Sequence, residues 1–168
     1  NRFRDFLAEI NIPLDADLFS AQYLHHLGQS AILFPGVVET LTELASLHKM
    51  AIITNGISAV QRSRLSLSPI QPFFDHLFIS EEIGISKPAE GYFAHVFQQL
   101  NHPARTSVLV IGDSLSSDIG GGAAYGLSTC WYNPAGLPNY SGIIPTYQIS
   151  TLPELVDICL PGHNNKND

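Results

Sequence analysis

The sequence predicts an α/β protein with a doubly wound parallel sheet. From residue 37 onward, short strands of continuous apolar residues alternate with segments that carry apolar residues on one helical face. Strands of a parallel sheet are buried on both faces, so they lack the alternating polar residues of a half-exposed strand. The 168 residues are 45% hydrophobic and 14% charged, which is enough apolar material to cover both faces with helices.

Two helical segments precede this alternation, at residues 2–10 and 16–28. The first has apolar residues three and four positions apart, as on one face of a helix: Phe3, Phe6, Leu7 and Ile10. Asp15 or Asp17 is suited to cap the second. Because a helical pattern is already present at Asn1, we expect further residues upstream.

Pro35 and Gly36 interrupt the helical pattern and predict a hinge. The chain is therefore expected to contain a helical unit, a core and a polar tail, at residues 1–34, 35–161 and 162–168. The strands expected in the core are residues 49–54, 73–80, 107–113, 128–132 and 146–150. The helices expected in the core are residues 37–48, 57–67, 89–100, 117–125 and 152–160.

Local signals mark the ends of several of these helices. Gly126 follows the fourth helix of the core, where glycine is the common C-terminal cap. Thr151 and Glu154 have the spacing of a capping box, and Pro153 between them suits the first turn of the last helix.

Composition excludes several classes of function. The formal net charge is −7, which argues against nucleic acid or an anionic membrane surface as the main partner. No run of eighteen apolar residues is present, so no membrane span is expected. Cys130 and Cys159 both lie in apolar surroundings and form no CxxC pair, which predicts buried thiols in a reducing cytoplasm.

The candidate functional residues follow the predicted strands, because ligands of parallel α/β sheets bind at the carboxyl ends of the strands. Thr54, Asn55 and Gly56 follow the first core strand, and they combine a hydroxyl with a turn into the next helix. Free N–H groups and the positive end of the helix dipole favour an oxyanion there. An ordinary turn with a capping threonine would also explain the triplet.

Lys87 follows the second core strand and directly precedes Pro88. Proline restrains its predecessor to an extended conformation, so Lys87 is held on a stiff approach to the sheet edge. The chain has 8 Lys and Arg in all, which makes a fixed cation at this place notable. The alternative is a solvated loop lysine.

Asp113 and Asp118 follow the third core strand. A bare carboxylate at the end of a buried strand is costly unless a cation or several donors compensate it. Two carboxylates so placed can share Mg²⁺, which prefers oxygen ligands. The alternative assigns Asp113 to a turn and Asp118 to helix capping. The sequence contains no GxGxxG, GxxxxGK[ST] or GxSxG motif that would indicate another chemistry.

In this order, the hydroxyl, the lysine and the two aspartates resemble the haloacid dehalogenase-like hydrolase superfamily, over residues 35–160. "IITNG" resembles its second motif, "SKP" its third and "GDSLSSD" its fourth. The resemblance implies a phosphate-binding hydroxyl at Thr54, a charge-neutralising Lys87, a magnesium ligand at Asp113 and a supporting acid at Asp118. Longer stretches around these motifs are most similar to the pyrimidine 5′-nucleotidase branch.

The family's first motif, DxDxT, is absent from the sequence. In the family this motif ends the central strand of a Rossmann-like sheet, and a helical cap follows it. Residues 1–34 resemble the end of such a cap, so the first strand and most of the cap are missing from this chain. Two strand edges would then lack a neighbour, and buried unpaired backbone groups are costly. We therefore expect another segment to supply the missing strand.

The resemblance implies a magnesium-dependent phosphomonoester hydrolase that forms an aspartyl-phosphate on an aspartate outside this chain. Thr54, Lys87 and Asp113 would be catalytic, and the phosphate would bind Thr54, Asn55, Gly56 and Lys87. The expected substrate is a small phosphorylated metabolite, specifically a nucleoside 5′-monophosphate. Two alternatives remain: another family phosphatase, phosphomutase or haloacid dehalogenase, or an inactive fragment or pseudoenzyme that acts by binding.

Overall fold

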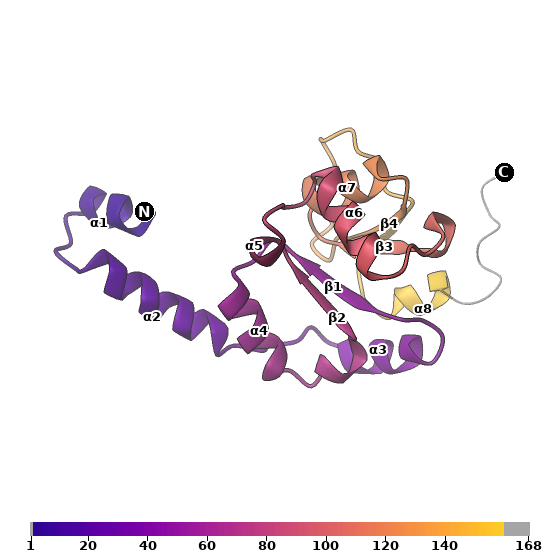
Figure 1. Ribbon diagram of the computed structural model, residues 1–168, viewed down its shortest axis with the longest axis horizontal. Coiled ribbons are helices and arrows are strands. Elements are labelled where there is room, and N and C mark those ends of the chain that lie inside the picture. The colour runs from indigo at the N-terminus through magenta and orange to yellow at the C-terminus, as the bar shows by residue number, and fades with distance from the viewer. Residues whose placement is uncertain (1, 160–168) are drawn as a thin grey trace.

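The computed structural model describes residues 2–159 and has the predicted α/β architecture, in which helices pack around parallel strands (Figure 1). The α-helices are α1 (Arg2–Glu9), α2 (Ala16–Gly28), α3 (Val37–Ala45), α4 (Ser58–Ser66), α5 (Ser80–Ile83), α6 (Glu90–Gln99), α7 (Gly121–Ala124) and α8 (Glu154–Cys159). The strands are β1 (Ala51–Thr54), β2 (His76–Ile79), β3 (Leu109–Gly112), β4 (Ser128–Tyr132) and β5 (Tyr147–Ile149). No helix in the described part is long and apolar enough to cross a membrane. The expected polar tail lies outside the described residues.

The strands form two parallel sheets within residues 2–159. β1 pairs with β2, and β3, β4 and β5 form a second sheet in that order. β1 and β3 are not paired with each other in the described part of the chain, so each is an edge strand of its sheet (Figure 1). This division agrees with the expectation of two strand edges that lack a central neighbour.

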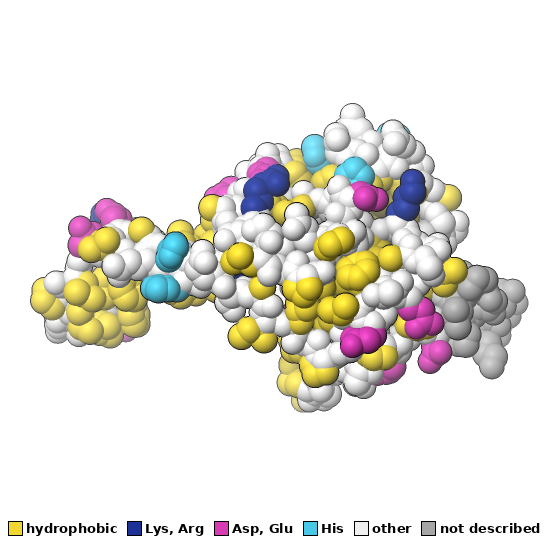
Figure 2. Space-filling model, turned by 90° about the horizontal axis from the view of Figure 1, so that it is seen from below, with side chains coloured by type: hydrophobic (Ala, Val, Ile, Leu, Met, Phe, Trp, Pro, Cys, Tyr) yellow, Lys and Arg dark blue, Asp and Glu magenta, His cyan; other side chains and the backbone are white. Residues whose placement is uncertain are grey.

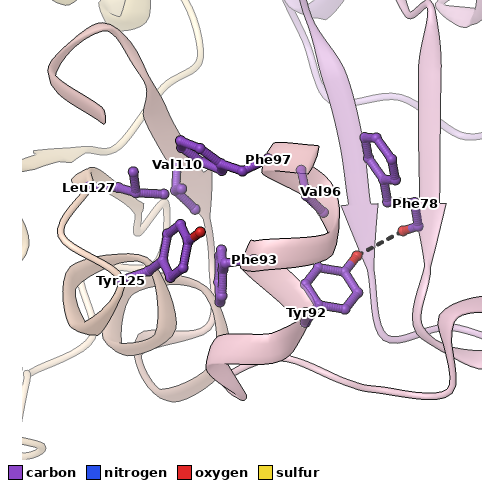
Figure 3. Close-up of a cluster of buried hydrophobic side chains, with 8 residues drawn as sticks. All are labelled: Phe78, Tyr92, Phe93, Val96, Phe97, Val110, Tyr125 and Leu127. Carbon is purple, nitrogen blue, oxygen red and sulfur yellow. Dashed lines mark hydrogen bonds between the residues drawn. The ribbon is translucent and has the colours of Figure 1, made fainter. Parts of the chain in front are cut away.

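Helix α6 joins the two sheets through the larger apolar core. Its residues pack between β2 on one side and β3 on the other (Figure 3). Phe93 of α6 stacks on Tyr125 with ring centroids 5.8 Å apart. The buried residues of this cluster come from both sheets and the helices between them: Phe78, Tyr92, Phe93, Val96, Phe97, Val110, Tyr125 and Leu127. Because apolar burial is the main stabilising term in folding, this cluster holds the sheets at a fixed separation.

A second cluster covers the other face of the β3–β4–β5 sheet. Its buried members come from the sheet and from α3 and α8: Leu44, Cys130, Ile149 and Leu155. Cys130 is fully buried and unpaired, and burial raises the pKa of its thiol to about 12. Helices therefore cover both faces of this sheet, as expected for a doubly wound fold.

Helices α1 and α2 project from the rest of the molecule as an arm (Figure 1). The base of the arm is fixed to α4, because the Ser63 hydroxyl donates to the Gly28 carbonyl at 2.9 Å and Arg64 Nε donates to the Ser30 carbonyl at 3.0 Å. Hydrophobic side chains gather on the outer part of the arm (Figure 2). Leu18 of α2 is 58% exposed.

The chain after β3 differs from the prediction of one helix over residues 117–125. A π-helical segment, Leu115–Gly120, comes first, and the short α7 follows it. The Ser114 carbonyl accepts hydrogen bonds from the N–H groups of both Asp118 and Ile119, at 3.0 and 3.2 Å. The apolar spacing indicated a helix but could not reveal this wider turn, which is stabilised by contacts of the buried Asp118 side chain.

Candidate active site

The end of β1 is held in place by a buried tyrosine of α6. The Thr54 N–H donates to the Tyr92 hydroxyl at 3.0 Å, and this hydroxyl donates to the Phe78 carbonyl at 2.8 Å (Figure 3). Tyr92 is 0% exposed, and burial raises the pKa of its hydroxyl to about 12, so the group remains a donor. It thus fixes the backbone of Thr54 relative to β2.

The Thr54 side chain is oriented by the glycine that follows it. Thr54 Oγ1 accepts a hydrogen bond from the Gly56 N–H at 3.1 Å, so its own proton remains available to donate to a ligand. A side chain at Gly56 would overlap the carboxamide of Gln61 in the first turns of α4. Glycine at this position therefore leaves room for the Gln61 side chain beside the turn.

Lys87 and Asp118 form a buried ion pair that links the loop between α5 and α6 to the π-helical segment after β3. Lys87 Nζ lies 2.7 Å from Asp118 Oδ1 and donates to the Ile53 carbonyl at 3.0 Å. The two side chains are only 7% and 10% exposed. Lys87 is therefore not a solvated loop residue, and its cation lies beside the end of β1.

The Asp118 carboxylate fits closely against β3. Its second oxygen accepts a hydrogen bond from the Ser114 N–H at 3.2 Å. An added Cβ at Gly112 would come within 2.5 Å of Asp118 Cβ. Glycine at this position therefore makes room for the carboxylate, and both carboxylate oxygens already accept a hydrogen bond.

The Asn55 side chain forms a bracket on the backbone of Lys87. Its Nδ2 donates to the Lys87 carbonyl at 2.8 Å, and its Oδ1 accepts from the Lys87 N–H at 2.9 Å. The loops after β1 and β2 are thereby joined by two hydrogen bonds from one side chain.

Asp113 lies directly after β3, with an exposed side chain. Its backbone carbonyl accepts a hydrogen bond from Trp131 Nε1 at 3.0 Å, which fixes the backbone at this point. Among the described residues, no hydrogen bond or ion pair is made by its carboxylate. Asp113 thus presents a carboxylate to solvent at the end of β3.

A magnesium ion could use Asp113 as one ligand. Mg²⁺ is commonly held by one or two carboxylates together with waters and substrate phosphates, and Asp113 offers an oxygen donor of this kind. No group of three or more His, Cys, Asp or Glu within residues 2–159 could hold a metal by itself. The described residues therefore fit part of such a site.

A cavity of about 440 Å³ lies beside Asn55 and Gly56, between the arm and α4. Most of its walls are apolar, and Ser20, Gln61 and Arg64 add polar groups. The apolar walls come from both sides of the cavity: Phe3, Leu24, Leu27, Ile57 and Val60.

Of the residues predicted from the sequence, five form one connected set: Thr54, Asn55, Gly56, Lys87 and Asp118. Within residues 2–159, the carboxylate of Asp113 makes no hydrogen bond or ion pair with this set.

Two features were missed, namely Tyr92 and the side-chain role of Asn55. The spacing of Tyr92 on its helix indicates a core residue, although the need of a buried hydroxyl for a partner could have suggested more. Nothing local in the sequence marks the bracket made by Asn55, because its partner is distant in the chain.

The family model of the haloacid dehalogenase-like hydrolases matches residues 3–132. The chain belongs to this family. This match confirms the resemblance found in the three motifs. The α/β fold described above is also the fold expected for a haloacid dehalogenase-like hydrolase.

Known relatives of this haloacid dehalogenase-like hydrolase are longer than the chain. The HAD-hydrolase YfnB of Bacillus subtilis is 40% identical over 157 residues, which cover 94% of this chain and 67% of YfnB. The pyrimidine 5′-nucleotidase YjjG of Escherichia coli is 36% identical over 154 residues, which cover 92% of this chain and 68% of YjjG. The pyrimidine 5′-nucleotidase PynA of Streptococcus pneumoniae is 33% identical over 160 residues, which cover 95% of this chain and 67% of PynA.

A solved structure is similar over nearly the whole chain. The crystal structure of YfnB bound to magnesium superposes with a TM-score of 0.87 at 39% identity, and the match covers 94% of this chain and 69% of that one. The arrangement of helices and strands described above is thus that of a solved family member.

Proposed function

We propose that this protein is a magnesium-dependent phosphatase that hydrolyses nucleoside 5′-monophosphates through an aspartyl-phosphate. Its family and its phosphatase relatives support the reaction class. The observation that carries the proposal is the buried Lys87–Asp118 pair, because it fixes a cation at the end of β1, the strand that Thr54 ends.

The geometry of Lys87 suits a phosphate oxygen. An ammonium group has three protons, and the contacts with Asp118 and Ile53 use two of them. The third proton, together with the Thr54 hydroxyl, is available to an anion at this edge. The Asn55 N–H would add a donor at the N-terminal side of α4, while the Gly56 N–H, which donates to Thr54 Oγ1, would act by keeping that hydroxyl turned toward the anion. Fixed donors of this kind stabilise the charge that develops during phosphoryl transfer.

The nucleophile would come from the family's first motif, which the sequence does not contain. We place that segment between β1 and β3, because these strands have unpaired edges in the described part of the chain. Its aspartate would attack phosphorus in line and displace the nucleoside, and water would then cleave the aspartyl-phosphate. During both steps, Thr54 and Lys87 would hold the phosphoryl oxygens.

Asp113 would be the ligand that this chain gives to magnesium, with Asp118 as a supporting acid through its contacts with Lys87 and Ser114. The bound ion would neutralise charge on the phosphoryl oxygens.

The leaving group would occupy the cavity between the arm and α4. Its volume of about 440 Å³ and its apolar walls are suited to a nucleoside, and Gly56 joins it to the proposed phosphate site. The nucleotidase names of YjjG and PynA favour the same substrate class, with a pyrimidine base.

The test is phosphate release by the full-length protein from a panel of monophosphates, with and without a metal chelator. We expect turnover of pyrimidine 5′-monophosphates that is lost with chelator and restored by Mg²⁺. Faster turnover of a sugar phosphate would show that the substrate is a sugar phosphate and contradict the assignment of a nucleotide. Halide release from a 2-haloacid would indicate a dehalogenase. No turnover of any panel member would leave a binding role and contradict the proposal.

A further inference from the structure

We propose that Asn55 is a positioning residue whose carboxamide fixes the backbone of Lys87, so that the ammonium group meets the phosphate in one place. This inference deepens the proposed function and rests on it. Asn55 would act through Lys87 by its side chain, whatever its backbone N–H contributes to the anion.

The contact has the form of a short antiparallel ladder made by a side chain. Asn55 donates to the Lys87 carbonyl at 2.8 Å and accepts from the Lys87 N–H at 2.9 Å. Both the donor and the acceptor of the carboxamide are used, and both backbone groups of Lys87 are satisfied. The two residues are 32 positions apart in the chain, so the bracket sets the relative position of two separate loops.

Lys87 is consequently held at both ends. The bracket fixes its backbone, and Asp118 with the Ile53 carbonyl fixes its Nζ. A lysine side chain is flexible, and ordering it is costly in rotamer entropy. A backbone that is already fixed reduces the number of arrangements in which the ammonium group can leave the site. Catalysis is sensitive to such placement, because a misplacement of about 1 Å can cost roughly 100-fold in rate.

Asparagine is suited to this position for a chemical reason. Aspartate would keep the acceptor for the Lys87 N–H but would lose the donor and set a carboxylate oxygen against the Lys87 carbonyl. It would also add negative charge beside the proposed phosphate site. A neutral side chain with one donor and one acceptor makes both contacts without repelling the substrate.

The experiment compares Asn55→Ala with Asn133→Ala in the full-length protein. Asn133 makes the same kind of bracket, donating to the Leu137 carbonyl at 3.0 Å and accepting from the Leu137 N–H at 2.9 Å. Each variant loses two hydrogen bonds of the same type, but only Asn55 touches Lys87. We expect Asn55→Ala to lower kcat/KM on the order of 10- to 100-fold and to weaken calorimetric binding of inorganic phosphate. Asn133→Ala should leave both quantities near the wild-type values.

A double-mutant cycle separates positioning from a general structural role. If Asn55 acts through the Lys87 ammonium group, Asn55→Ala should change phosphate affinity by less than about 2-fold in a Lys87→Met background. An undiminished effect in that background would overturn the inference, as would equal kinetic losses in Asn55→Ala and Asn133→Ala. If Lys87→Met does not fold, the comparison of the two asparagine variants decides alone.

Amide hydrogen exchange gives a readout that does not need activity. Asn55→Ala should reduce protection of the Lys87 N–H, and Asn133→Ala should not. Unchanged protection in Asn55→Ala would overturn the inference even in an active enzyme. A wild-type protein that neither binds phosphate nor releases it would instead contradict the proposed function, whatever the exchange data show for the bracket.

Discussion

Removal of the Lys87 charge tests the buried ion pair directly. Lys87→Met keeps the length of the side chain but leaves the Asp118 carboxylate, 10% exposed, with the Ser114 N–H as its remaining donor. Loss of one partner of a buried pair costs about 3–5 kcal/mol, because the remaining charge is desolvated without compensation. The retained hydrogen bond places the expected loss near the lower limit, about 3 kcal/mol. For a chain of this size, this corresponds to a decrease in Tm of roughly 6–12 °C.

Urea unfolding followed by the fluorescence of Trp131 measures this loss. Trp131 is the single tryptophan of the chain and is 4% exposed in β4, so its emission reports on the sheet that carries Asp113. The control is Lys87→Met combined with Asp118→Asn, which removes both charges. This double variant should lose at least about 1.5 kcal/mol less stability than Lys87→Met alone, because no buried charge then lacks a partner. A single variant within about 1 kcal/mol of wild type, or a double variant as unstable as the single one, would refute the reasoning.

Three further predictions concern two site residues and one exposed ion pair. Tyr92→Phe removes the hydroxyl between Thr54 and the Phe78 carbonyl, and we expect a loss of about 2 kcal/mol in urea unfolding, with a change below about 0.5 kcal/mol as the contrary result. Asp113→Asn should abolish magnesium-dependent turnover while the unfolding curve stays near wild type, because the side chain is exposed; near-normal turnover would argue against a metal role. The Arg62 guanidinium, and then the Ser58 hydroxyl, lower the pKa of Glu82 from 4.5 to about 2. A lowered carboxyl pKa stabilises the fold above pH 4.5, and this contribution is lost as the pH falls from 4.5 toward 2. Between pH 4.5 and pH 2, the unfolding free energy of Glu82→Gln should therefore fall less steeply than that of the wild type. The same pH dependence in both proteins would contradict the lowered pKa of Glu82.

The sequence alone determined the order of the five strands and of the longer helices in the core, but not the short α5, and it determined the place of the candidate residues after the strands. Strands such as β1 and β4 are short apolar runs between helical patterns, and their positions follow from local residue order. The motifs that follow the strands also identified the family, which the comparisons confirm. The wider turn at Leu115–Gly120 was not predicted, because six residues with two apolar side chains are too few to distinguish one π-helical turn from an α-helical one.

Only the tertiary structure decided how the site is assembled. The sequence placed Lys87 and Asp118 after different strands, but their ion pair forms only when the loop that carries Lys87 and the π-helical segment that carries Asp118 meet at the end of β1. The bracket from Asn55 to Lys87 and the bridge from Tyr92 to Thr54 connect residues 32 and 38 positions apart. Local propensities fix backbone conformation over a few residues, whereas these contacts form only when packing of α6 brings the loops together. The sequence therefore determined which groups were available, and the packed core determined which of them meet.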